Sequence, residues 1–254
     1  MPTPMPRKRV LMLHGWTKNG QAFKDSLEPF CRECETRGIE LVFVDAPHGV
    51  SVEGRMQAWK TARRTTQHDP DDPWLKELLS VSDSRTWWDY SKEGTVALGL
   101  DDSMNTVKKA LEKQRFDGVF GFSQGAAAAA IVASILERPS MYPSFLCDGK
   151  PIHPPLQFCV CISGFRLIDP VASRVLTTSF QTPALHIAGR LDDVVPMPRS
   201  RALMDLSERK RVIIHDDGHV VPLTAPWIAF YCDFIQKVSL DAPAPVQETR
   251  PALL

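Results

Sequence analysis

Short, nearly uninterrupted apolar runs recur along the chain, and segments with helical spacing of apolar residues separate them. Six of these runs are predicted to be strands: 9–13, 40–45, 117–121, 158–162, 184–188 and 211–215. Because they lack the alternation of a half-exposed strand, they are typical of a parallel sheet buried on both faces. Apolar residues three and four positions apart predict helices over 21–37, 96–114, 124–137, 197–208 and 225–238. The pattern therefore predicts an α/β fold, with a central, mostly parallel sheet and helices on both faces.

Two stretches depart from this rhythm. Residues 47–94 show little periodicity, contain several prolines and charges, and carry four of the six tryptophans. A connection this long is usually functional, so we expect a lid or pocket-forming loop inserted after the second strand. The tail, residues 241–254, is rich in proline and alanine and is expected to be disordered. We therefore expect a single domain over 1–240, with 47–94 as its insertion.

Charge and hydropathy narrow the choice of partner and compartment. The 254 residues carry 30 Lys+Arg and 30 Asp+Glu, a formal net charge of zero. This balance does not supply the basic surface that binds a phosphate backbone, so no nucleic-acid partner is expected. The longest apolar stretch, 125–136, is too short to cross a bilayer, and no signal-peptide apolar region follows the N-terminus. We expect a cytoplasmic protein with no membrane partner, and the oligomeric state stays open.

The six cysteines do not follow the pattern of a metal site. Cys31 and Cys34 form a C-x-x-C pair, and Cys159 and Cys161 form a C-x-C pair more than a hundred residues away. A structural zinc site needs two such pairs at compact spacing. We therefore expect reduced thiols, with no metal and no cofactor.

The motif with the clearest chemistry is Gly121-Phe122-Ser123-Gln124-Gly125, a G-x-S-x-G sequence between a predicted strand and a predicted helix. This context is that of a nucleophile elbow, a strained strand-to-helix turn in which the glycines relieve crowding. Small alanines follow and allow the helix to pack closely on the sheet. Ser123 is therefore the predicted nucleophile, and a serine in an ordinary glycine-bounded turn is the alternative.

A base and an acid are expected after this serine, in the chain order serine, acid, histidine. His219 lies in a turn directly after the last predicted strand and is the predicted base. The other histidines lie in strands, in loops or before the serine, and His14 is expected to brace a turn. Asp192, after the penultimate strand, is the preferred acid, with Asp193 in reserve and Asp169 a distant third.

An oxyanion hole needs two backbone N–H groups, one directly after the nucleophile and one from the loop after the first strand in this chain. Gln124 supplies the first. The second is predicted to be the N–H of Trp16, because Gly15 before it lets the backbone approach the serine closely. The positive end of the helix that follows Ser123 supports the same developing charge.

Taken together, these motifs resemble the FSH family of serine hydrolases within the α/β-hydrolase superfamily. The matching segments are 10–16 with Asn19-Gly20, Arg85-Thr86-Trp87-Trp88, 121–125, 189–196 and Gly218-His219, and they span residues 9 to about 236. The resemblance implies an α/β-hydrolase fold. It also implies an acid that begins a D-x-x-V/I-P pattern, which favours Asp192 over Asp193. The paired tryptophans imply that 47–94 helps to form the acyl pocket instead of a separate domain.

Trp87 and Trp88 are the residues of this insertion most directly implicated in a pocket. Pockets are often lined by aromatic side chains, so either residue is a candidate to line it. Large aromatic side chains in a long loop also serve as anchors against the body of a protein. Both interpretations stay open at this point.

The sequence therefore predicts a serine esterase or thioesterase that cleaves small-molecule esters or thioesters with apolar acyl groups through an acyl-enzyme. A first alternative is a thioesterase that takes a polyketide chain from an acyl-carrier domain, as fungal members of the family do. A second is a non-catalytic small-molecule receptor built on a hydrolase fold. The neutral charge permits apolar acyl substrates without identifying one.

Overall fold

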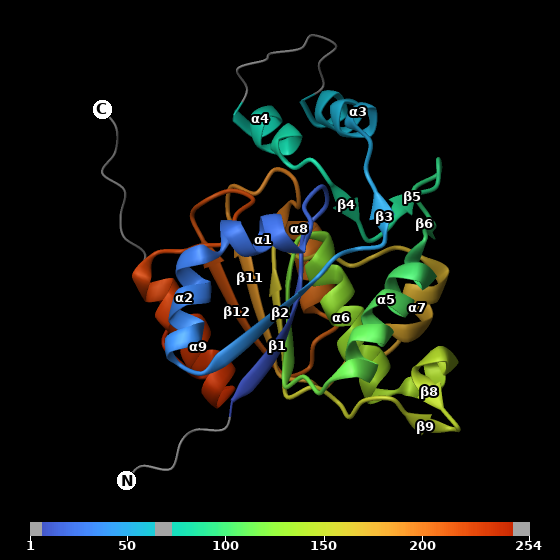
Figure 1. Ribbon diagram of the computed structural model, residues 1–254, viewed down its shortest axis with the longest axis vertical. Helices are drawn as coiled ribbons and strands as arrows, with labels where there is room; N and C mark the ends of the chain where they lie inside the picture. The colour runs from blue at the N-terminus through green and yellow to red at the C-terminus, as the bar shows by residue number, and fades with distance from the viewer. Residues whose placement is uncertain (1–6, 64–72, 246–254) are drawn as a thin grey trace.

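A six-stranded parallel sheet forms the centre of the molecule in the computed structural model, which describes residues 7–63 and 73–245 (Figure 1). The strand order is β12-β11-β10-β7-β1-β2. The strands are β1 (Lys8–Leu13), β2 (Ile39–Val44), β7 (Gly118–Phe122), β10 (Phe158–Ile162), β11 (Ala184–Gly189) and β12 (Lys210–His215). All six predicted strands are confirmed, with each end within one residue of its expected position.

The order of the strands reverses between β1 and β7. The chain runs from β1 outward to β2, and then returns to the other side of β1 for β7, β10, β11 and β12. Connections from the carboxyl ends of β1 and β7 therefore diverge, which leaves a crevice at this edge of an open sheet. Leu13 pairs with Gly121, so the turns that follow the two strands start at the same level of the sheet.

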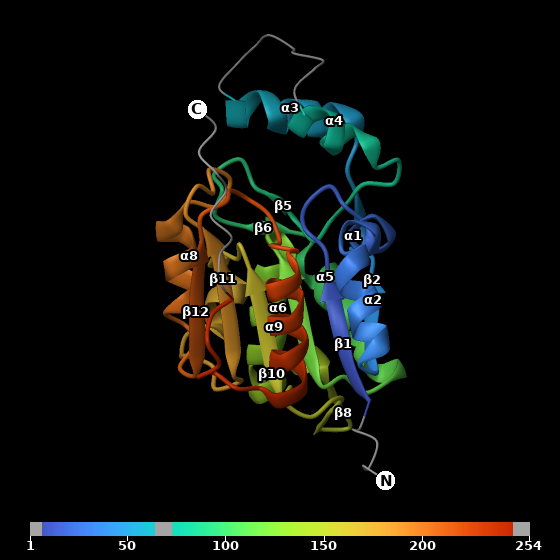
Figure 2. The same ribbon diagram turned by 90° about the vertical axis from the view of Figure 1, so that its left-hand side faces the viewer.

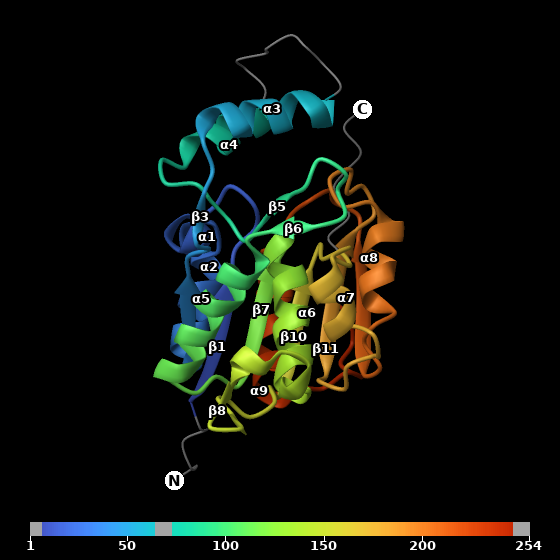
Figure 3. The same ribbon diagram turned by 90° about the vertical axis from the view of Figure 1, so that its right-hand side faces the viewer.

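Helices cover both faces of the sheet and enclose two large apolar clusters. One face carries α1 (Gly20–Ser26), α2 (Glu28–Thr36) and α9 (Ala225–Lys237) (Figure 2). The other face carries α5 (Leu100–Lys113), α6 (Gln124–Glu137), α7 (Pro170–Val175) and α8 (Met197–Met204) (Figure 3). Helix α6 is buried from Gln124 to Leu136, because its run of alanines lets the whole helix lie close against the sheet. Two rigid layers therefore hold the turn before α6 in place.

Three of the predicted helices have different bounds in the structure, and one short helix was not predicted. The helix expected over 21–37 is interrupted at Leu27, because Pro29 lacks the N–H that would continue the hydrogen-bond ladder and instead starts α2. Helix α5 begins at Leu100 instead of 96, because Ala97–Leu98 forms the short strand β6. Helix α8 ends four residues before position 208. Helix α7 was not predicted, since six residues are too few for a periodic signal.

The insertion over 47–94 was expected as a loop, but it contains two helices and two small ladders. Its elements are β3 (His48–Gly49), α3 (Val52–Arg63), α4 (Pro73–Ser80), β4 (Arg85–Thr86) and β5 (Asp89–Tyr90), with β3 paired to β4 and β5 to β6. Helices α3 and α4 lie above the carboxyl end of the sheet (Figures 1 and 3). Among the described side chains of the two helices, Met56, Leu75 and Leu78 pack together with Trp16, whereas Val52 and Leu79 are exposed.

The remaining elements lie away from the carboxyl end of the sheet. They are two short 3-10 turns (Pro139–Met141 and Pro143–Phe145) and the hairpin of β8 (Leu146–Cys147) with β9 (Lys150–Pro151). Among the described residues, no helix has the length and apolar character needed to cross a membrane, and no cluster of three metal-ligand side chains occurs. The predicted disordered tail falls mostly on residues 246–254, which lie outside the described part of the chain.

Candidate active site

Ser123 occupies a sharp turn between β7 and α6. Its backbone has φ 55° and ψ −119°, a conformation that an L-residue adopts only when its surroundings enforce it. A Cβ on Gly121 would lie 2.2 Å from the carbonyl oxygen of Gly125, and a Cβ on Gly125 would lie 2.1 Å from that of Leu13. Both positions therefore require glycine, and the motif exists because the turn is this tight. The local geometry is that of a nucleophile elbow.

The side chains of Ser123, His219 and Asp192 form one continuous hydrogen-bonded chain. His219 Nε2 lies 3.0 Å from Ser123 Oγ, and His219 Nδ1 lies 2.7 Å from Asp192 Oδ2. The three residues come from the turns after β7, β12 and β11, which end at the same edge of the sheet. The fold thus brings together residues that are up to 96 positions apart in sequence.

Asp192 is held as a buried carboxylate. Burial by itself raises its pKa, but the hydrogen bond and charge of His219 and the backbone N–H of Val195 outweigh that effect, so the pKa is lowered overall. Its Oδ1 accepts hydrogen bonds from the N–H groups of Val194 and Val195, at 3.0 and 2.8 Å. An ionised carboxylate can only accept hydrogen bonds, so the proton between the two side chains resides on His219 Nδ1. The lone pair of Nε2 is then directed at the Ser123 hydroxyl.

The two reserve acids lie elsewhere. Asp193 is exposed to solvent. Asp169 caps α7 by accepting from the N–H groups of Val171 and Ala172, and it also accepts from the N–H of Ala97 in β6. It is therefore a structural residue, committed to three backbone donors.

His14 braces the turn after β1, as expected from the sequence. Its Nδ1 lies 2.7 Å from the carbonyl oxygen of Gly15, while its Nε2 accepts from the N–H of Ala46 at 3.0 Å. These partners require a neutral ring with the proton on Nδ1. Burial lowers the pKa of His14 to about 4, which is consistent with a neutral ring.

Buried histidines make the stability of this protein depend on pH. Burial lowers the pKa of His14 to about 4 and that of His186 to about 3, whereas an unfolded histidine has a pKa of about 6.5. The unfolded chain therefore binds more protons as the pH falls below about 6.5, and stability is lost. Between pH 7 and pH 5 we expect the free energy of unfolding to fall by about 2 kcal/mol for each of these histidines.

Urea unfolding at the two pH values measures this loss. The variant His186→Gln keeps a polar partner for Ser207. Its free energy of unfolding should fall by about 2 kcal/mol less than that of the wild type between pH 7 and pH 5. An unfolding free energy that is flat from pH 7 to pH 5 would contradict the prediction.

The turn after β1 lies beside Ser123. A Cβ on Gly15 would come within 3.3 Å of the Ser123 Cβ, so the glycine allows the close approach expected of it. In the part of the chain that the structure describes, the N–H groups of Trp16 and Gln124 donate no hydrogen bond to another protein atom. Two unpartnered donors next to the serine are the requirement of an oxyanion hole. Their assignment to that role stays a prediction.

The side chain of Gln124 has a second task, which sequence reasoning missed. Its Oε1 accepts from the N–H of Trp87 and the hydroxyl of Thr86, at 2.9 and 3.0 Å, and its Nε2 donates to the carbonyl of Trp88 at 2.8 Å. The amide thus joins the elbow to the insertion. The sequence carries no clear signal for these contacts, because two of the three partners are main-chain atoms.

Both predicted pocket tryptophans are anchored in the core. Trp87 is 0% exposed and donates from Nε1 to the carbonyl of His14 at 2.8 Å. Trp88 is 1% exposed and packs edge-on against Phe165, with ring centroids 6.5 Å apart. These contacts support the anchoring interpretation, and a pocket-lining role stays a prediction.

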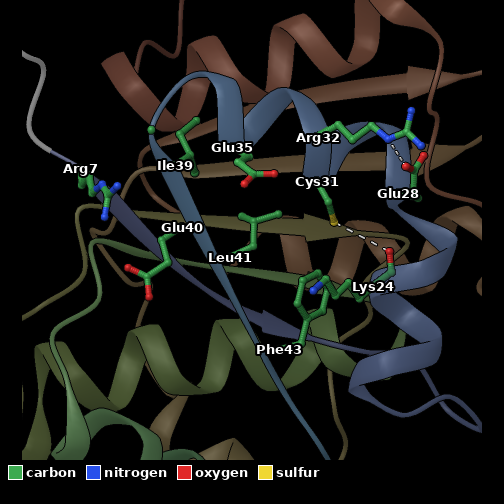
Figure 4. Close-up of a pocket in the computed structure, with 11 residues that line it drawn as sticks. Arg7, Lys24, Glu28, Cys31, Arg32, Glu35, Ile39, Glu40, Leu41 and Phe43 are labelled. Atoms are coloured by element: carbon green, nitrogen blue, oxygen red, sulfur yellow. Dashed lines mark hydrogen bonds and ion pairs between the residues drawn. The ribbon is translucent and has the colours of Figure 1, made fainter.

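Exposed apolar side chains occur close in sequence to two members of the hydrogen-bonded chain. Leu191 and Val194 flank the acid and are 70% and 40% exposed, and Val220, next to His219, is 44% exposed. A groove of about 490 Å³ lies elsewhere, along β2 and α2 at the edge of the sheet, and mixed charges such as Glu35, Glu40 and Arg32 line it (Figure 4). No member of the hydrogen-bonded chain lines that groove.

The parallel sheet, its strand order and the elbow define an α/β-hydrolase. Comparison with known proteins agrees. A family model described as serine hydrolase (FSH1) matches residues 3–231. The chain is 30% identical over 242 residues to esterase AAEL000016 of Aedes aegypti, with 92% of this chain and 77% of that protein covered. It is 28% identical over 240 residues to esterase OVCA2 of Danio rerio, with 90% and 96% covered.

A solved structure, that of esterase PE8, has the same fold, with a TM-score of 0.56, 20% identity and coverage of 94% of this chain and 97% of that one. The chain belongs to the FSH1 family of serine hydrolases. The family resemblance expected from the motifs is confirmed.

Proposed function

We propose that this serine hydrolase cleaves carboxylic esters or thioesters of apolar acyl groups, with Ser123 as nucleophile, His219 as general base and Asp192 as the acid that orients it. The observation that carries the proposal is the unbroken chain from Ser123 Oγ through His219 to Asp192, with contacts of 3.0 and 2.7 Å. Nucleophile–base and base–orienter hydrogen bonds of this length are what acyl transfer by a serine requires.

Acylation begins when His219 Nε2 accepts the hydroxyl proton as Ser123 Oγ attacks the acyl carbonyl carbon. The π electron pair moves to the carbonyl oxygen, and the N–H groups of Trp16 and Gln124 stabilise that oxyanion. The imidazolium is stabilised by Asp192, whose carboxylate lies 2.7 Å from Nδ1. The tetrahedral intermediate then collapses, the bond to the alcohol or thiol breaks, and His219 gives its proton to the leaving group.

Deacylation repeats these steps with water as the nucleophile. His219 accepts a proton from water, the hydroxide oxygen attacks the acyl-enzyme carbonyl, and the oxyanion forms in the same place. Collapse releases the carboxylic acid and returns the proton to Ser123. No step in this cycle calls for a cofactor.

The substrate class follows from the surroundings of the site. Leu191, Val194 and Val220, close in sequence to Asp192 and His219, expose apolar surface, and burying such surface against an acyl chain is favourable by about 25 cal/mol per Å². The leaving group is either an alcohol or a thiol, and an acyl-carrier domain is one source of such a thioester. We place the reaction in the cytoplasm.

Burst kinetics test the proposal. We expect p-nitrophenyl acetate to release close to one equivalent of p-nitrophenol per protein before the steady state, because the acyl-enzyme accumulates. A fluorophosphonate probe should modify Ser123, located by mass spectrometry of the labelled peptide. Parallel assays of p-nitrophenyl esters, free acyl-thioesters and carrier-bound acyl-thioesters of increasing chain length would then rank the leaving groups. A protein with no burst, no labelling and no turnover would be a receptor instead of an enzyme.

A further inference from the structure

The turn that carries the N–H of Trp16 is strained and is held by the insertion. Thr17 has φ 68°, a left-handed conformation that is uncommon for a β-branched residue. Its N–H donates to the carbonyl of Arg85 at 2.9 Å, and the N–H of Arg85 donates to the carbonyl of Lys18 at 2.9 Å. Asn19 Nδ2 also donates to the carbonyl of Asp83, at 2.9 Å. Such a conformation persists only where several contacts enforce it, and these contacts come from the far end of the insertion.

The indole of Trp16 is a second point of attachment. It packs, together with Met56 of α3, against Leu75 and Leu78 of α4, which are 1% and 5% exposed. This cluster is separate from the two large clusters that cover the faces of the sheet. The side chain of Trp16 therefore lies in the small core of the α3–α4 pair, while its main chain lies beside Ser123.

Arg55 joins the two helices that form this small core. It projects from α3, is 4% exposed, and donates from Nη1 to the carbonyls of Leu78 and Val81, both at 2.9 Å. These carbonyls are at the end of α4, where the last turn leaves acceptors without partners and the helix dipole favours a cation. A buried guanidinium with this geometry fixes the end of α4, and with it Leu78.

We propose that the α3–α4 insertion supports one of the two donors of the oxyanion hole, the N–H of Trp16. Arg55 is then a positioning residue that acts through Leu78 and Trp16 to hold this N–H in place. The inference rests on the proposed function of Ser123. It makes the insertion part of the catalytic geometry, in addition to any contact with the acyl group. If the end of α4 is no longer fixed, the oxyanion should be stabilised less, whereas the binding of uncharged ligands should not change.

The expected size of the effect follows from what a displaced donor does. Removal of one oxyanion donor lowers kcat by about 10²- to 10³-fold, and a misplacement of about 1 Å lowers the rate by up to about 10²-fold. Arg55→Met keeps the length and apolar stem of the side chain but removes its donors and charge. We expect it to slow acylation by about 10- to 100-fold.

Stopped-flow acylation by p-nitrophenyl acetate measures this directly, because its acetyl group keeps contacts of the acyl chain to a minimum. In Arg55→Met the burst rate constant at saturating ester should fall by about 10- to 100-fold, with the half-saturating concentration unchanged within about twofold. An alkyl trifluoromethyl ketone, which forms an oxyanion on Ser123, should lose affinity by a similar factor. The corresponding trifluoromethyl alcohol, which cannot form one, should bind as before.

Two further variants separate positioning from general damage. Glu53→Gln changes an exposed residue on the same helix and should keep the wild-type burst rate constant. Arg55→Lys restores a charge and donors at the end of α4 and should recover part of the loss. Should Arg55→Met differ from wild type in near-ultraviolet circular dichroism, Leu78→Ala carries the same test at the next contact, because it removes the side chain that packs with Trp16.

If the burst rate constant of Arg55→Met equals that of the wild type, the inference is overturned and the proposed function stands. The same holds for Leu78→Ala where that variant carries the test. Equal losses of affinity for the ketone and the alcohol also overturn it, because the residue would then act on binding in general. A wild-type protein that shows no burst and no fluorophosphonate labelling overturns the proposed function itself, so the two failures are distinguishable.

Discussion

Ser123→Ala should lower kcat for p-nitrophenyl acetate by a factor of about 10⁴ or more, because loss of the nucleophile in a serine triad leaves only the oxyanion hole and substrate binding to accelerate hydrolysis. The fold should be retained. Alanine fits the space of a serine that is 8% exposed, and the backbone at φ 55° strains both residues alike. Steady-state release of p-nitrophenol and fluorophosphonate labelling measure the loss.

Ser134→Ala is a matched control for this variant. Ser134 lies in the same helix, α6, is fully buried, and has a hydroxyl with no hydrogen-bond partner among the described residues. It should retain turnover within about twofold, since its hydroxyl contributes no hydrogen bond that its loss would break. A Ser123→Ala protein with more than about a hundredth of wild-type turnover would be incompatible with a serine nucleophile.

Asp192→Asn should lower kcat by about 10⁴-fold, the size of effect seen when a triad acid becomes an amide. The structure gives a specific reason. The N–H groups of Val194 and Val195 both point at Oδ1, so the oxygen of an asparagine must occupy that position. Its NH₂ group is then directed at His219 Nδ1, which lies 2.7 Å from Oδ2 in the native protein. The ring must adopt the tautomer with the proton on Nε2, which cannot accept a proton from Ser123.

Asp193→Asn provides the comparison, because it makes the same chemical change one residue away on an exposed side chain. Its kcat should stay within about twofold of wild type. A similar loss in both variants, measured at saturating p-nitrophenyl acetate, would mean that charge near the site matters and that the orientation of His219 does not.

The six strands could be predicted from the chain because each reads as a largely apolar run, and the inner strands β7, β10 and β11 are buried along their whole length. The elbow could be predicted because its geometry excludes any side chain at Gly121 and Gly125. In both cases a local physical requirement selects the residue type. His219 and Asp192 followed from these, since triad residues come from the turns at the carboxyl ends of the strands.

The insertion could not be predicted in the same way. Among the described side chains of α3 and α4, the buried apolar residues lie against each other and against Trp16, which is more than 50 residues away from α4 in sequence. The buried guanidinium of Arg55 looks like any surface arginine in the sequence, because its partners are backbone carbonyls that have no residue-type signature. The same holds for the side chain of Gln124, whose partners are mostly main-chain atoms.

The sequence by itself determined the fold class, the elbow and the chain order of the candidate triad, because burial and steric exclusion act on residues one at a time. Only the tertiary structure decided between Asp192 and Asp193 on geometric grounds, since neighbouring side chains in a loop point in different directions that a sequence does not record. It also showed Trp87 and Trp88 as anchors, and it joined the insertion to the turn of Trp16. Those relations are contacts between distant segments, and they exist only once the sheet has brought its carboxyl ends to one edge.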